Sequence, residues 1–185
     1  RVEYRSSPVL KKIYIKDENI RSQELDKHTP LYIPTMYSGN CVYGPFRSYE
    51  DKFYMEWQSC LVSAIPLLTV KSHPKSKLVT NHFRDEKRSL ESCYKDYDLL
   101  ILDYFSTAMT VSLFSRKPII FFDIGLRNMT KEFIAIVKNR CLYVEIDFQE
   151  DIREQIIQGV NKYVDFSGVW SNSALEKLSL NGDSK

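Results

Sequence analysis

The chain has 185 residues, a length that suits a single domain with or without terminal extensions. It is 43% hydrophobic and 27% charged, as globular proteins usually are. Its 26 basic and 24 acidic residues leave a formal net charge of +2, which argues against a nucleic-acid-binding protein. We therefore expect no nucleic acid partner, and any bound anion should be held by a local site.

Three regions differ in composition along the chain. Residues 1–29 are mostly polar and charged, and we expect an N-terminal arm or linker there. Residues 30–166 carry the apolar patterns of a folded domain, and residues 167–185 are expected to form a C-terminal tail. All apolar runs are shorter than the roughly 20 residues of a membrane span. We expect a cytoplasmic protein, with the inner face of the cytoplasmic membrane as a candidate location.

Short apolar runs, separated by polar segments, are predicted to be strands. The run at residues 98–103 is apolar along most of its length, which favours a strand covered on both faces, as in a parallel sheet. The predicted strands cover residues 31–34, 67–71, 98–103, 119–122 and 142–146. The stretch between the second strand and residue 85 is polar and is predicted to be mainly loop.

Helical segments are predicted between and after these strands. Phe53, Trp57 and Leu61 recur at helical spacing, and Ile152, Ile156 and Val160 form a similar apolar stripe. The predicted helices cover residues 49–64, 86–94, 106–115, 130–138 and 148–163. Regular alternation of strand and helix predicts an α/β fold with a doubly wound, Rossmann-like parallel sheet.

Ligands of open parallel sheets bind beyond the carboxyl ends of the strands. This rule selects four loops, at residues 35–47, 72–77, 103–107 and 123–128. In the last loop, Arg127 is a candidate for pairing with an anion, although a solvated arginine is the more common outcome. The four cysteines (Cys41, Cys60, Cys93 and Cys141) form no C-x-x-C pair, which favours free thiols and disfavours zinc.

Ser106 and Thr107 follow the strand that ends at Asp103 and stand at the start of a predicted helix. A helix N-terminus offers unpaired N–H groups and the positive end of the helix dipole, and two hydroxyl groups would complete a phosphate site. Serine is also among the best N-caps, so Ser106 has an equally plausible structural role.

His73 and Pro74 follow the second strand directly, and Lys71 adds positive charge beside them. Proline favours an extended conformation for the residue before it, so His73 should point away from the strand end, towards a phosphate or a ribose. A surface turn with a solvated histidine is the alternative. Thr35, at the start of the first loop, is a further candidate contact.

The order of these motifs resembles a known enzyme family. Pro34-Thr35, Val70–Pro74, Ser106-Thr107 and Lys117-Pro118-Ile119-Ile120 are similar to the C-terminal domain of GT-B glycosyltransferases of bacterial surface polysaccharide synthesis. The similar groups use cytidine-activated donors: sialyltransferases, Kdo transferases and CDP-glycerol glycerophosphotransferases.

The resemblance implies a nucleotide site without a metal or other cofactor, in which the donor nucleotide is CMP or CDP. It assigns His73 and Pro74 to the nucleotide, and Ser106 and Thr107 to its phosphate. The expected contact set is His73, Pro74, Ser106, Thr107, Thr35, Lys71 and Asp103. The catalytic residues stay unknown, because the family's base usually belongs to an N-terminal half that is not recognisable in this chain.

The expected activity is therefore transfer of a sugar, such as Kdo or sialic acid, from a CMP donor to a glycan or lipid-linked acceptor. Membrane-peripheral association or membership of an assembly complex is compatible with this role. Phe105 separates Tyr104 from Ser106, whereas the glycerophosphotransferases tend to carry Asp-Tyr-Ser-Ser, so transfer of a polyol phosphate is the weaker alternative. A second alternative is a non-catalytic module that binds a nucleotide or a glycan.

Overall fold

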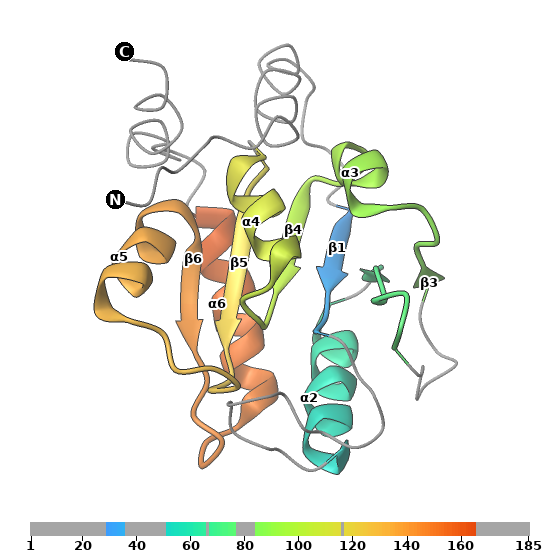
Figure 1. Ribbon diagram of the computed structural model, residues 1–185. Helices are drawn as coiled ribbons and strands as arrows, with labels where there is room; N and C mark the ends of the chain where they lie inside the picture. The colour runs from blue at the N-terminus through green and yellow to red at the C-terminus, as the bar shows by residue number, and fades with distance from the viewer. Residues whose placement is uncertain (1–28, 36–50, 66, 77–83, 116, 166–185) are drawn as a thin grey trace, which may run out of the picture.

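A computed structural model describes residues 29–35, 51–65, 67–76, 84–115 and 117–165 (Figure 1). The predicted arm up to residue 28 and the predicted tail at residues 167–185 lie outside the described residues. So do Cys41 and residues 36–47 of the first predicted loop.

The described residues form a parallel sheet of six strands in the order β3-β2-β1-β4-β5-β6. This is the strand order of the Rossmann fold, so the predicted doubly wound α/β architecture is confirmed. The strands are β1 Pro30–Ile33, β2 Thr69–Val70, β3 Arg84–Asp85, β4 Leu99–Leu102, β5 Ile119–Asp123 and β6 Leu142–Glu145.

Helices cover both faces of the sheet. Helices α2 (Asp51–Ala64) and α6 (Ile152–Asp165) pack on one face, and α6 passes behind β5 in Figure 1. The other face carries α3 (Leu90–Cys93), α4 (Thr107–Phe114) and α5 (Lys131–Arg140). Neighbouring residues of each strand point to opposite faces, so both sides of the sheet are apolar and both need a helical layer.

Strand β3 and the segment after it differ from the prediction. Arg84 and Asp85 lie in the stretch predicted to be polar loop, yet they pair with Thr69 and Val70 of β2. An edge strand of two charged residues has no apolar run, so hydrophobic patterning could not identify it. The helix expected over residues 86–94 is shorter: α3 is followed by a 3₁₀ turn, η1, at Tyr94–Asp96.

Residues 86–88, where that helix was expected to begin, form ion pairs instead. The Arg88 guanidinium contacts Glu86 at 2.7 Å and Asp96 at 2.6 Å. Hydrogen bonds from Arg88 lower the pKa of Glu86 to about 2, so this carboxylate stays charged. These contacts connect the residues after β3 with η1, and Ser89 to Glu91 lie between the two connected ends.

Candidate functional site

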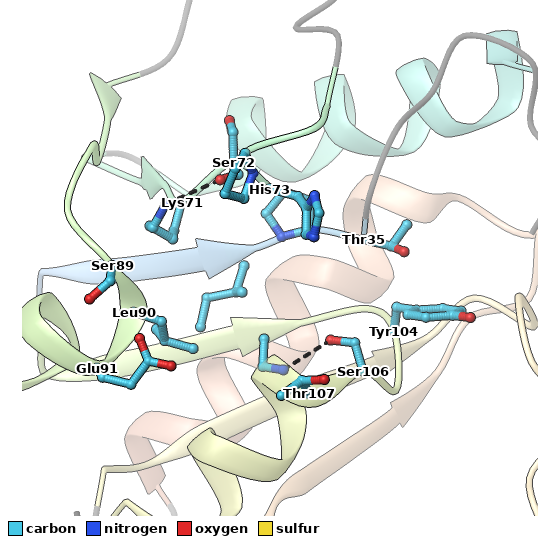
Figure 2. Close-up of a pocket in the computed structure, with 14 residues that line it drawn as sticks. Thr35, Lys71, Ser72, His73, Ser89, Leu90, Glu91, Tyr104, Ser106 and Thr107 are labelled. Carbon is cyan, nitrogen blue, oxygen red and sulfur yellow. Dashed lines mark hydrogen bonds between the residues drawn. The ribbon is translucent and has the colours of Figure 1, made fainter. Parts of the chain in front are cut away.

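A pocket of about 450 Å³ lies where the strand order reverses, between β1 and β4. Carboxyl ends of strands at such a switch point are the usual ligand site of open α/β sheets. The pocket is lined by Ile33, Pro34, Thr35, Lys71, Ser72, His73, Pro74, Ser89, Leu90, Glu91, Tyr104, Ser106, Thr107 and Ala108. We call it the switch-point pocket (Figure 2).

The structure brings six of the seven expected contact residues to this pocket. They are Thr35, Lys71, His73, Pro74, Ser106 and Thr107. They come from the ends of β1 and β2 and from the start of α4, which are far apart in sequence. The seventh, Asp103, is not among the lining residues.

Ser106 is the N-cap of α4, so the structural role weighed for it is confirmed. Its backbone is extended, with φ −138° and ψ −175°, and its Oγ accepts a hydrogen bond from the Ala108 N–H at 3.2 Å. The hydroxyl keeps its own proton for donation, because capping uses only an acceptor lone pair. Thr107 follows at the first position of the helix and is exposed.

The exit of β2 supplies the basic side of the pocket. The Lys71 Nζ donates to the Ser72 carbonyl at 3.1 Å, and the lysine is half-buried. His73 is exposed, and its Nδ1 accepts from the Lys75 N–H at 3.2 Å. With Nδ1 acting as an acceptor, Nε2 is the ring nitrogen that carries a proton and can donate to a ligand oxygen.

Asp103 belongs to the opposite face of the sheet, which corrects its assignment to the nucleotide. It is 2% exposed, and its Oδ2 accepts hydrogen bonds from Tyr32, from Tyr54 at 2.7 Å and from Trp57 at 3.0 Å. Side chains alternate along an extended segment, so Asp103 shares the α2 face with Ile101, while Leu102 faces α3 and α4.

Asp103 is nevertheless connected to the switch-point pocket through the hydroxyl of Tyr54. The Thr35 N–H donates to the Tyr54 hydroxyl at 3.2 Å, and that hydroxyl donates to Asp103. Burial raises the pKa of Asp103, and the hydrogen bonds from Tyr32, Tyr54 and Trp57 oppose this rise. The network connects the core with the backbone of Thr35 at the pocket wall.

Sequence reasoning missed the side of the pocket formed by α3. Ser89, Leu90 and Glu91 line the pocket because the segment after β3 returns across the sheet. Figure 2 shows Glu91 on the α3 side, with Ser106 and Thr107 at the start of α4. The segment carries no local signal for this position, since it depends on pairing of the edge strand β3. Tyr104, at the turn after β4, was also missed.

The fourth predicted loop lies elsewhere along the same edge. Asp123, Arg127 and Asn128 line a separate pocket at the ends of β5 and β6. Gly125, between them, has φ 72°, a conformation that glycine adopts without strain, and its N–H donates to Asp123 Oδ1 at 2.9 Å.

Within the described part of the chain, no group of three or more His, Cys, Asp or Glu side chains is placed to hold a metal ion. Cys60, Cys93 and Cys141 carry free thiols. Burial raises the pKa of Cys93 to about 11 and that of Cys141 to about 12, so neither is a ready thiolate. None of the described helices is long and apolar enough to cross a membrane.

The chain matches no model of a protein family, and comparisons with curated proteins and with solved structures gave no match either.

Proposed function

We propose that this chain is the donor-binding domain of a glycosyltransferase, and that the switch-point pocket binds the phosphate of a cytidine-activated sugar. One observation carries the proposal: Ser106 and Thr107 at the start of α4 converge with Lys71 and His73 in one pocket at the β1–β4 switch point. The resemblance of the motifs to cytidine-dependent glycosyltransferases supports the choice of nucleotide.

The side chains contribute more to phosphate binding than the helix dipole does. A helix N-terminus stabilises an anion by about 0.5 kcal/mol at an exposed site. A hydrogen bond to a charged group contributes about 2 kcal/mol. The hydroxyls of Ser106 and Thr107, with the His73 Nε2–H and the Lys71 ammonium, therefore set the affinity, and the dipole adds to it.

The same groups stabilise the leaving phosphate during transfer. The bond between the anomeric carbon and the phosphate oxygen of CMP breaks, and its electron pair leaves with that oxygen. A new bond forms from the anomeric carbon to an acceptor hydroxyl, whose proton passes to a base that the resemblance assigns to a second domain. Donors already in place around the phosphate lower the barrier without reorganisation.

Thermal unfolding with CMP, CDP and UMP tests the nucleotide. We expect CMP to raise the unfolding temperature in a concentration-dependent way, because a ligand that binds the folded state stabilises it by mass action. A larger effect of CDP would favour transfer of a polyol phosphate over transfer of a sugar. No effect of any of the three would contradict the nucleotide site.

Substitution of Ser106 separates binding from helix capping. Alanine would remove the cap and destabilise α4 by about 1 kcal/mol, whereas asparagine and aspartate cap as well as serine. We expect Ser106→Asn and Ser106→Asp to unfold at similar temperatures, while Ser106→Asp binds CMP more than about tenfold more weakly through charge repulsion. Calorimetric titration measures this difference, and equal affinities of the two variants would place the phosphate elsewhere.

A further inference from the structure

A second pocket, which we call the β5–β6 pocket, lies at the same edge of the sheet. Its volume is about 650 Å³, within the range of pockets that hold small organic ligands. It is lined by Asp123, Ile124, Gly125, Arg127, Asn128, Met129, Ile134, Lys138, Tyr143, Glu145, Ile146, Asp147, Phe148 and Gln149. None of these residues lines the switch-point pocket.

The charges of the β5–β6 pocket are mixed. Three carboxyl groups (Asp123, Glu145 and Asp147), two cations (Arg127 and Lys138) and two side-chain amides (Asn128 and Gln149) line it. Three carboxylates disfavour a phosphate. Donors and acceptors side by side suit a ligand that offers both, and a sugar hydroxyl donates one hydrogen bond and accepts others.

Several of these groups are held in place. The Tyr143 hydroxyl donates to Asp123 Oδ2, and the Gly125 N–H donates to Asp123 Oδ1. Asp123 pairs with Glu145 across β5 and β6, so both side chains point to the α5 face. Burial, helped by the hydrogen bond to Asp123, raises the pKa of Tyr143, so its hydroxyl keeps its proton at neutral pH.

Arg127 connects the two pockets. It lines the β5–β6 pocket, and its Nη1 donates at 3.2 Å to the Phe105 carbonyl, in the turn between Tyr104 and Ser106. Its guanidinium also lies 5.3 Å from the centre of the Phe105 ring. Two ligands, one in each pocket, would thus lie on opposite sides of one short turn, with Tyr104 on the side of the switch-point pocket.

We propose that the β5–β6 pocket binds a hydroxyl-rich carbohydrate through Asp123, Glu145 and Arg127. The assignment of this carbohydrate as the acceptor glycan rests on the proposed function, whereas carbohydrate binding itself does not. Under that assignment, the acceptor hydroxyl must reach past the turn at Tyr104 and Phe105 to contact the anomeric carbon of the donor.

The test uses the full chain on an array of immobilised neutral, amino and acidic oligosaccharides. We expect the chain to bind at least one of these classes of immobilised oligosaccharide. We expect Glu145→Ala to weaken that binding by about tenfold, since it removes a charged hydrogen-bond acceptor. Glu150→Ala is the matched control, because Glu150 is an exposed acid in the next loop that does not line the pocket.

The outcomes separate this inference from the nucleotide site. Glu145→Ala should leave stabilisation by CMP unchanged, because Glu145 lies outside the switch-point pocket. Glycan binding that depends on Glu145 in a chain that ignores CMP would uphold the β5–β6 pocket and reject the proposed function. The inference would be overturned if the chain bound none of the oligosaccharides, or if Glu145→Ala and Glu150→Ala bound them equally well.

Discussion

Asp103 is a carboxyl group in the apolar core, with Tyr32, Tyr54 and Trp57 as its hydrogen-bond donors. A buried carboxyl group is costly to ionise, and its donors reduce that cost without abolishing it. The Tyr54 hydroxyl also accepts from the Thr35 backbone, so the cluster determines where the chain leaves β1 at the pocket. A residue outside the pocket thereby positions part of its wall.

The raised pKa of Asp103 predicts a pH dependence of stability. Because the folded state holds this proton more tightly than the unfolded state, stability is lost as the pH rises from about 4 through the raised pKa. Asp103→Asn keeps an acceptor oxygen and cannot ionise. Urea unfolding of both proteins at increasing pH should therefore show that the free energy of unfolding of Asp103→Asn rises relative to that of the wild type. If the difference in unfolding free energy between the two proteins does not change with pH, a raised pKa of Asp103 is contradicted.

At the scale of elements, α6 lies unusually close to the sheet at Gly159. A Cβ atom at this position would meet the Phe122 ring and the Val144 methyl group, each at 3.1 Å. Phe122 is fully buried and packs edge-on against Trp57, with ring centroids 5.5 Å apart, so it has little room to move. Glycine therefore allows α6 to cover β5 and β6.

We expect Gly159→Ala to destabilise the fold. Overpacking of a core costs about 2 kcal/mol, and alanine regains about 1 kcal/mol of helix propensity, which leaves a net loss of about 1 kcal/mol. Gln158→Ala, at an exposed position of the same helix, should change stability by less than about 0.5 kcal/mol. Urea denaturation measures both, and a stabilised Gly159→Ala would show that α6 can move away from the sheet.

The sheet and most of its helices could be predicted from the sequence because strands buried on both faces appear as apolar runs. The four residues of β4 are all buried, and the run that contains them is unmistakable. Arg84 and Asp85 of β3 carry no such pattern, since edge pairing depends on backbone N–H and C=O groups that every residue type except proline carries. The segment that leads from β3 into the pocket was therefore missed as well.

The candidate site could be predicted in part for a related reason. His73, Ser106 and Thr107 follow the carboxyl ends of strands, and in a parallel sheet all carboxyl ends lie at the same edge. Asp103 also follows a strand end, but the alternation of side chains directs it into the α2 face. Its direction depends on the exact residue at which β4 ends, and patterning alone does not locate strand ends to one residue.

At the scale of the whole molecule, two pockets share the carboxyl edge of one sheet, and we propose that a nucleotide phosphate occupies the switch-point pocket. Amide NMR spectra recorded during a CMP titration test it most directly. We predict saturable shifts at Thr107, Ala108 and His73, with the amides of Gly125 and Glu145 unchanged. Shifts confined to residues of the β5–β6 pocket, or none at the start of α4, would contradict the account.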